Sequence, residues 1–423
     1  MERRYEIRRR ELLEDAEVQS KQLDGMLSRL EEFARPFAKC LERKKQRTLT
    51  HQYLAGLLSQ VERKNVESIA YHHDQDRQAL QKFIGQYGWD HRPLMHELVR
   101  QVAQRIGHDH GVLVLDPSSF PKQGPESVGV KQQWCGRQGR LANCQVGVYL
   151  AYAAPEENAL VDMRLYLPSE WASSKARRRK CGVPAEVRFR TRQQLGLEML
   201  DEHRSVLPQR WIAADEEFGH DAEFRGQLHH RGERYLLTIP SVMLIRDLEA
   251  RRPPAGDYGP QPKTPWKRVS RWCAALKDSA WTSVEIEEGE RGPRTVEVVV
   301  RSVQAKSAAH QNRRELLVVV RQRMSDGTLR HDYYLSNAGE HTLPVQFVRV
   351  IQARHRIEEC FQLAKGQAGL ADYEVRTWRG WHHHQALSLI AAWFLTQETR
   401  EGKKNHSGAQ RAASAHDLGL VAA

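Results

Sequence analysis

The spacing of the apolar residues changes along the chain, and this change constrains the fold more than any other feature. From about residue 5 to 107, Leu, Phe, Val and Ile recur every three or four positions and Gly and Pro are scarce, which predicts helices. At Gly111 the pattern becomes a continuous apolar run, Gly-Val-Leu-Val-Leu, followed by Asp116 and Pro117. This run predicts a buried strand that ends at Asp116, because proline can neither extend a ladder nor continue into a helix. A helical module is therefore expected to precede a domain that contains a sheet.

Strand and helix patterns alternate in that second domain. Residues 143–167 have the pattern of two strands around a turn, and residues 191–207 have helical spacing. A further short apolar run, residues 210–214, stops at Asp215. A hairpin, a helix and separate strands in this order predict an α/β fold with a mixed sheet flanked by helices.

Residues 236–340 return to a strand-like period and predict an all-β insertion. Asp326-Gly327 is typical of a hairpin turn, and the Pro- and Gly-rich segment from Arg251 to Pro265 predicts a long loop. The clearest strand runs are residues 296–300, 316–320 and 333–335.

Helical spacing resumes at residues 345–396, and the small, polar residues after Gly402 predict a disordered tail. The chain has no internal repeat at a fixed period. The predicted division is a helical region at 1–107, the first part of the α/β core at 108–235, the insertion at 236–340, the last part of the core at 341–400 and the tail at 401–423.

The charge balance favours a polyanionic partner. The chain carries 65 Lys and Arg against 53 Asp and Glu, a formal charge of +12 with a pI near 9.5. An ordinary cationic enzyme is the alternative, because net charge alone does not name a ligand. The charged N-terminus lacks the apolar segment of a signal peptide, and no apolar stretch approaches membrane-spanning length, so a membrane protein is not expected.

The cysteines and a histidine run predict no metal site. The six cysteines contain no CxxC pair, which fits reduced thiols in a cytoplasm. Cys135 and Cys144 lie in one Gly- and Arg-rich stretch, but no second ligand pair accompanies them as a zinc site requires. Adjacent residues on a helix point in different directions, so the run His382-His383-His384 is not expected to close on one ion.

Two aspartates follow apolar strand patterns. Carboxyl ends of strands in an α/β sheet face the crevice in which ligands usually bind, so Asp116 and Asp215 are candidates for a site there. Either residue alone is equally explained as a turn residue or a helix cap. The pair therefore needs a third member.

Glu358 supplies that member, because Arg354, Glu358, Phe361 and Lys365 advance by four, three and four positions and share one face of a helix. An alternative interpretation is a surface ion pair between Arg354 and Glu358, which contributes about 0.3 kcal/mol. The sequence pattern alone leaves both interpretations open.

Longer motifs surround the three acids. The first reads Val-Leu-Asp116-Pro-Ser-Ser-Phe-Pro-Lys-Gln-Gly and continues through Ser127-Val-Gly-Val to residues 139–148. The second reads Ala-Ala-Asp215-Glu-Glu-Phe-Gly. Over about residues 30 to 400 the sequence resembles bacterial insertion-sequence transposases of the DDE class, whose catalytic domain is RNase H-like.

The third motif carries the most specific part of this resemblance. One large transposase subgroup has the pattern Tyr, two residues, Arg, three residues, Glu, six residues, Lys, and here Arg354, Glu358 and Lys365 fit it. Ile351 occupies the tyrosine position, which departs from the pattern. Glu359 is a rival for the third acid, but only Glu358 has the matching flanks.

The resemblance implies metal-dependent DNA cleavage and strand transfer at the ends of an insertion sequence. It implies that Asp116, Asp215 and Glu358 hold Mg²⁺ or Mn²⁺, as two ions, because carboxylate oxygens suit these cations. Arg354 and Lys365 are then expected to bind the phosphates that flank the scissile bond. A DNA nuclease without joining activity and a non-catalytic DNA-binding derivative remain alternatives.

The resemblance also implies partners and accessory regions. The expected partner is double-stranded DNA, both as the terminal inverted repeats and as the target. A homodimer or larger assembly in the cytoplasm is expected to bind it, and residues 1–107 are expected to recognise the repeats. The stretch Lys175-Ala-Arg-Arg-Arg-Lys180 either extends the DNA track or is a solvated loop. In the insertion, Trp266, Trp272 and Trp281 are core residues by default, but the resemblance implies that an aromatic there stacks a flipped base.

Overall fold

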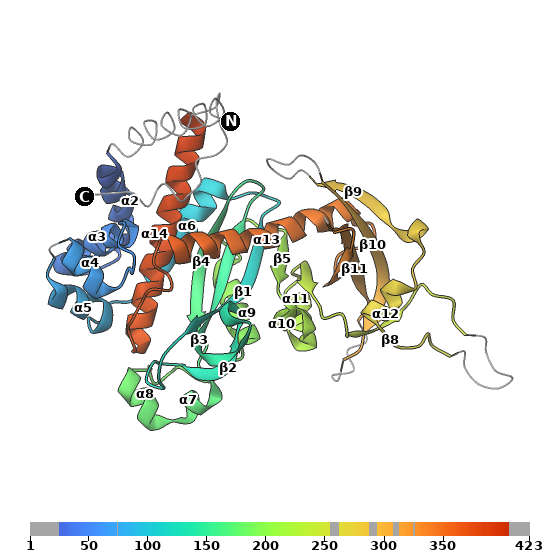
Figure 1. The fold of residues 1–423 in the computed structure, drawn as a ribbon, viewed down its shortest axis with the longest axis horizontal. Helices are drawn as coiled ribbons and strands as arrows, with labels where there is room; N and C mark the ends of the chain where they lie inside the picture. The colour runs from blue at the N-terminus through green and yellow to red at the C-terminus, as the bar shows by residue number, and fades with distance from the viewer. Residues whose placement is uncertain are drawn as a thin grey trace.

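The structure is a computed structural model that describes residues 25–73, 75–253, 262–286, 294–307, 313–324 and 326–405. Figure 1 shows a helical N-terminal part, a central sheet with helices and a β-rich part, joined by the long helix α13 (Pro344–Gly366). No helix in these ranges is both long and apolar enough to cross a membrane.

From residue 25 the N-terminal part is helical, as its apolar spacing predicts, whereas residues 1–24 of the predicted helical region lie outside the described residues. In α2 the residues Met26, Leu30, Ala34 and Phe37 are buried along one face. The C-terminal helix α14 (Trp378–Asn405) packs against α3, α5 and α6, and one hydrophobic core runs from these helices into the sheet. The helices of this part are α2 (Met26–Lys39), α3 (Lys44–Leu58), α4 (Val66–His72), α5 (Arg77–Gly85) and α6 (Arg92–Ile106).

The central sheet combines antiparallel and parallel strands. β1 pairs antiparallel with β3 and parallel with β5, and β5 pairs parallel with β6. β2 and β4 pair antiparallel with β3. This order confirms the predicted α/β, RNase H-like mixed sheet. The strands are β1 (Val112–Pro121), β2 (Lys131–Cys135), β3 (Arg140–Ala153), β4 (Asn158–Leu165), β5 (Trp211–Ala214) and β6 (Tyr235–Thr238).

The prediction that the first strand ends at Asp116 is wrong. β1 continues to Pro121, and Pro117 pairs with Val148 of β3. The other neighbour, β5, pairs with β1 only as far as Leu115, so one edge of β1 is unpaired from Asp116 onward. Proline is tolerated at such an edge because its missing N–H removes no ladder bond there.

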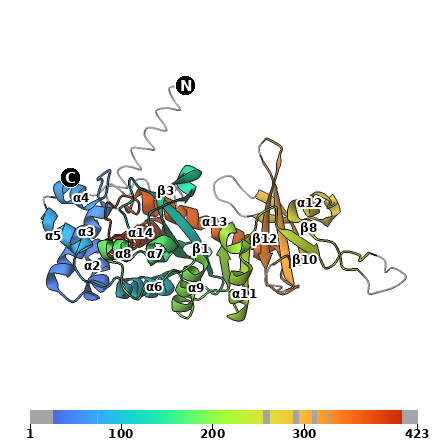
Figure 2. The same cartoon turned by 90° about the horizontal axis from the view of Figure 1, so that it is seen from below.

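Helices cover both faces of this sheet. Gly196 of α9 approaches Leu115 of β1 so closely that a Cβ at Gly196 would lie 2.9 Å from Leu115 Cδ1. On the opposite face Tyr149 packs edge-on against Phe361 of α13, with ring centroids 5.1 Å apart. Figure 2 shows α9 and α11 along its lower side. The shorter helices are α7 (Ser169–Ser173), α8 (Lys175–Cys181), α9 (Arg192–His203), α10 (Glu216–His220), α11 (Ala222–His230) and the 3-10 turn η1 (Gly136–Gln138).

The basic stretch from Lys175 to Lys180 is part of a helix, α8, where a loop was one interpretation of the sequence. The Ser174 side chain accepts a hydrogen bond from the Arg177 backbone N–H at 3.3 Å and so caps the first turn. Gly182 ends the helix in a left-handed conformation with φ of 63°.

The insertion is built mainly of antiparallel strands, and the three clearest strand runs of the sequence lie in β10, β11 and β12. Gly327, with φ of 82°, lies in the predicted turn between β11 and β12. The short helix α12 (Val269–Ala274) departs from an all-β insertion, because its buried side chains join the insertion core. The strands are β7 (Leu244–Asp247), β8 (Lys267–Arg268), β9 (Thr282–Ile286), β10 (Arg294–Ala305), β11 (Glu315–Arg323) and β12 (Leu329–Ser336), and η2 (Asp278–Ala280) is a 3-10 turn.

The insertion is continuous with the core, because β12 pairs with β6 and the described strands form one 12-stranded sheet. The boundary expected at residues 235/236 therefore falls inside β6. Within the predicted loop from Arg251 to Pro265, residues 254–261 lie outside the described residues, as do 406–423 of the predicted tail, whereas α14 extends to Asn405.

A buried ion pair joins the core to the insertion. Arg225 Nε of α11 donates to Glu315 Oε1 of β11 at 2.9 Å, and the Tyr235 hydroxyl donates to the same oxygen at 2.6 Å. Arg225 and Glu315 side chains are each only 5% exposed. Removal of either partner would leave the other charge buried without compensation.

We expect Glu315→Ala to lower the free energy of unfolding by about 3–5 kcal/mol, because it leaves the Arg225 guanidinium buried without a counter-charge. The matched control is Glu198→Ala, which removes the exposed Arg190–Glu198 pair at 2.8 Å. That control is expected to lose less than about 1 kcal/mol. Urea unfolding followed by circular dichroism measures both values, and equal losses would contradict a special role for the buried pair.

Candidate active site

Asp116 and Asp215 are brought together by the parallel pairing of β1 with β5. The last paired residues are Leu115 and Ala214, so the two aspartates are the next residues of adjacent strands. Both side chains are half-buried. Asp116 lies within a strand and is no helix cap, whereas Asp215 Oδ1 accepts from the backbone N–H groups of Glu217 and Phe218 at 3.1 and 3.4 Å. Asp215 thus caps α10 with one carboxylate oxygen.

The predicted polar stripe of α13 faces the same side of the sheet. Tyr149 is the β3 partner of Asp116 and contacts Phe361 of the stripe. Residues directly opposite one another in a ladder project from one face, so Asp116 also points towards α13. Lys365 Nζ lies 4.8 Å from the centre of the Phe361 ring and 5.9 Å from that of Phe120 of β1.

The electrostatics of Asp116 link the five residues predicted to form the site. Burial, followed by the Asp215 carboxylate, raises the pKa of Asp116 to about 7. Arg354 and Lys365 act in the opposite direction, and Glu358 adds a further increase. The two carboxyl groups and the charged stripe therefore lie within electrostatic reach of one another.

The charged form of the neighbouring Asp215 carboxyl group is also disfavoured. Burial and then Glu217 raise the pKa of Asp215 to about 6, while Arg354 and the backbone N–H groups of α10 oppose the increase. Burial lowers the pKa of Lys365, and Asp116 partly restores it. The negative charge of the two aspartates is thus incompletely balanced by the protein, as in a site that binds a cation.

Ile351, at the position of the family tyrosine, is buried in the core on α13, with a relative exposure of 9%. It offers no hydroxyl group or accessible ring. Glu358, in contrast, is exposed, and Arg354 is half-buried.

The three predicted acids do not form the tightest group of potential metal ligands. Among the described residues, only Asp162, Glu202 and His203 have ligand atoms that all lie within 4.8 Å of one another. Asp162 pairs with Leu150 of β3, which pairs with Leu115, so this group lies on the α9 face of the sheet, opposite Asp116. No sequence pattern indicates this group, because it forms through strand register and helix packing.

An arginine already neutralises that second group. Arg164 Nη1 contacts both carboxylate oxygens of Asp162 at 2.7 Å, and Arg164 Nη2 contacts Glu202 at 2.6 Å. Burial alone would raise the pKa of Asp162, but Arg164 and the hydrogen bond with His203 hold it below its usual range. The geometry is that of a structural ion-pair network that joins β4 to α9.

The three consecutive histidines have separate partners. His382 Nδ1 contacts Trp378 O at 2.9 Å, and His384 Nδ1 contacts the Tyr53 hydroxyl at 2.8 Å. His383 lies between two backbone carbonyls and stacks on Trp89 with centroids 3.6 Å apart. Burial lowers the pKa of His383 and of His384 to about 4, so these rings are neutral links between α14 and its surroundings.

The tryptophans of the insertion are engaged within it. Trp272 is buried and donates through Nε1 to Asp247 at 2.9 Å. The Arg246 and Arg321 guanidinium groups lie 4.3 Å from the ring centres of Trp266 and Trp281. A base could stack on the latter two rings only on the faces away from these arginines or after displacing them.

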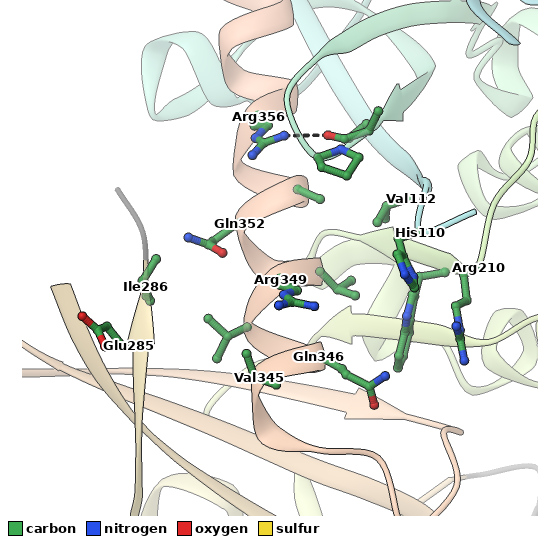
Figure 3. A pocket seen from close by; sticks show the side chains of 17 residues that line it. His110, Val112, Arg210, Glu285, Ile286, Val345, Gln346, Arg349, Gln352 and Arg356 are labelled. Carbon is green, nitrogen blue, oxygen red and sulfur yellow. Dashed lines mark hydrogen bonds between the residues drawn. The ribbon is translucent and has the colours of Figure 1, made fainter. Parts of the chain in front are cut away.

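A cavity of about 490 Å³ lies beside the first half of α13, away from the acids. Val112 and Trp211, the first residues of β1 and β5, line it, whereas Asp116 and Asp215 follow the far ends of the same paired segment. Figure 3 shows His110, Arg210 and Arg349 around this cavity. It is therefore separate from the candidate active site.

Comparison with known proteins identifies a family. Residues 36–293, more than half of the 423-residue chain, match the family described as DDE superfamily endonuclease. No curated protein matches the chain. Among solved structures, the cryo-EM structure of the piggyBac transposase synaptic complex with hairpin DNA matches over 93% of this chain and 76% of that chain, at a TM-score of 0.40 and 10% sequence identity.

We expect Asp116→Asn to stabilise the fold at neutral pH in EDTA. The pKa of Asp116 is raised from 3.8 to about 7, so folding disfavours its charged form. The wild type should lose stability relative to the variant as pH rises from about 4 to about 7, and the difference should then stay constant. Since one pKa unit corresponds to about 1.36 kcal/mol, a gain of at least about 1 kcal/mol is expected at pH 8.

Urea unfolding across this pH range measures the effect. Asp326→Asn is the control, because a hydrogen bond from the Thr328 hydroxyl lowers the pKa of Asp326, and its removal should not stabilise the fold. A stability difference between wild type and Asp116→Asn that does not change with pH would contradict the burial of an unbalanced carboxylate.

Proposed function

We propose, from the premise that this chain belongs to the DDE superfamily endonuclease family, that it is a DNA transposase of the insertion-sequence type. It cleaves DNA at the ends of its element and joins the freed 3′ ends to a target. The observation that supports this most is the convergence on Asp116 of four charges, from Asp215, Glu358, Arg354 and Lys365. These are the residues that the sequence motifs select independently.

The donor atoms fit divalent cations. Asp116, Asp215 and Glu358 offer carboxylate oxygens alone, which suits Mg²⁺ or Mn²⁺ better than softer metals. Two ions about 4 Å apart can be held by carboxylates from different sides, so three acids that serve them need not touch one another. When bound, such ions lower the pKa of an attacking water or 3′-hydroxyl and neutralise charge at the phosphorus centre.

The basic residues of α13 orient the DNA. Arg354 lies one turn before Glu358 and Lys365 two turns after it, so their charges flank the carboxylate along the helix. We propose that they bind successive phosphates and align the scissile bond for in-line attack. The half-buried position of Lys365 strengthens its attraction for a phosphate, because solvent screens it less.

The remaining parts of the chain complete the proposed assembly. The helical region that ends near residue 107 recognises the terminal inverted repeats, and helix α8, with Arg177, Arg178, Arg179 and Lys180, extends the phosphate track. Pairing of two element ends requires a homodimer or a larger assembly. The enzyme acts in the cytoplasm, on the nucleoid when it is bound to DNA.

We expect Glu358→Ala to abolish cleavage but retain DNA binding. Purified protein is incubated with duplexes that carry candidate element ends and Mg²⁺ or Mn²⁺. The variant should lose at least about 100-fold in rate, equivalent to about 2.7 kcal/mol of activation free energy. Equal activity of variant and wild type would remove Glu358 from the site.

Glu359→Ala is the matched control, because Glu359 neighbours Glu358 on α13 but contacts Asn158 Nδ2 of β4 at 3.3 Å, away from the stripe. It should cleave like the wild type. A target plasmid in the same reaction separates the alternatives: joined products support a transposase, free 3′ ends alone indicate a nuclease, and binding without cleavage indicates a non-catalytic derivative.

A further inference from the structure

The hairpin that connects β2 to β3 carries an exposed apolar pair within a basic segment. Trp134 is 60% exposed and Leu141 is 71% exposed, and the two residues pair across the hairpin. Residues 131–141 contain Lys131, Arg137 and Arg140 but no acid. We call Trp134, Arg137, Arg140 and Leu141 the hairpin tip.

The apolar pair projects from the same face of the sheet as Asp116. Asp116 pairs with Tyr149, and residues 141, 143, 145, 147 and 149 of β3 share that face because side chains alternate along a strand. The opposite face of the hairpin is covered, since Cys135 and Cys144 are buried with Val146 in a small core of their own. Helix α13, which ends at Gly366, and helix α14, whose Gln385 accepts from the Tyr149 hydroxyl, both cover the Asp116 face, and the apolar pair is left uncovered.

The hairpin tip lies next to the charged end of the candidate site. The Arg137 backbone N–H donates to Ser119 Oγ at 3.5 Å, which places the turn of the hairpin beside β1 three residues beyond Asp116, although the Ser119 side chain itself projects from the opposite face. Arg137 is also one of the charges that act on Lys365, whose pKa it lowers after burial. A phosphate bound by Lys365 would therefore lie within reach of Arg137.

Trp134 differs from the other tryptophans in its accessibility. All ten lie in the described part of the chain, and Trp134 alone has a largely exposed side chain. An accessible aromatic ring beside a turn that carries an exposed arginine, Arg137, combines the two features that bind single-stranded nucleic acid, in which a ring stacks on a base and a cation binds the backbone.

We propose that the hairpin tip holds the DNA strand next to the cleaved bond, with Trp134 and Leu141 against an unpaired base and Arg137 on its phosphates. This inference rests on the proposed function and deepens it by naming the surface that receives a separated strand. The absence of acids in the hairpin favours DNA over a second copy of the chain as the occupant.

The test is DNA binding in EDTA, which requires no cleavage, measured by fluorescence anisotropy with two probes. One probe is a blunt duplex that carries a candidate element end, and the other has the same sequence with unpaired bases at the 3′ end. Trp134→Ala should weaken binding of the second probe by about tenfold and that of the first by less than about twofold, whereas Trp134→Phe should retain most of the affinity. Leu343→Ala, at another exposed apolar residue, is the control and should bind like the wild type.

Each result decides between the two proposals. Wild-type cleavage together with unchanged binding by Trp134→Ala would overturn the hairpin proposal alone. Weaker binding of the probe with unpaired bases by Trp134→Ala, together with no cleavage by the wild type, would support the hairpin contact and overturn the enzymatic function. A change in molecular mass of DNA-free Trp134→Ala by light scattering would show an interface between copies and overturn the hairpin proposal, and binding of neither probe by the wild type would overturn both.

Discussion

The parallel pairing of β1 with β5 is the constraint on which the candidate site depends. Its register ends with Leu115 opposite Ala214, and this sets two aspartates side by side where β5 stops. A shift of one residue in either strand would turn one carboxylate towards α9 and the hydrophobic core. Burial, followed by the Asp215 carboxylate, raises the pKa of Asp116, and burial followed by Glu217 raises the pKa of Asp215, so the charged forms of both carboxyl groups are disfavoured.

Helix α13 completes this arrangement, and its position depends on both halves of the molecule. It contacts β1, β3 and β5 of the core and β9 and β10 of the insertion. The insertion is itself anchored by the pairing of β12 with β6 and by the buried contact between Arg225 and Glu315. The helix that carries Glu358 therefore packs on both the core and the insertion.

The periodic parts of this fold could be predicted from the sequence, because burial on one face leaves a pattern in a single segment. The strands, the hairpin turn at Gly327 and the stripe around Glu358 belong to this class. Features that depend on partners could not be predicted. Pro117 predicted the end of a strand, but the strand continues because β5 no longer pairs with β1 at that point. The absence of this neighbour is a tertiary property, which the sequence of one segment does not show. The network around Asp162 and the exposure of Trp134 arise from cross-strand register and from the place where α13 ends. The motif resemblance, not the periodicity, selected Glu358 over Glu359.

The central claim is that Asp116, Asp215 and Glu358 form one cation site, although a tighter acid and histidine group lies on the opposite face of the sheet. Calorimetric titration of Mn²⁺ into the wild type, Asp116→Asn, Glu358→Gln and Glu202→Gln tests it most directly. We expect the first two variants to lose Mn²⁺ binding and Glu202→Gln to bind like the wild type, because Arg164 already neutralises the Glu202 group. Unchanged binding by Asp116→Asn, or a loss confined to Glu202→Gln, would contradict the account.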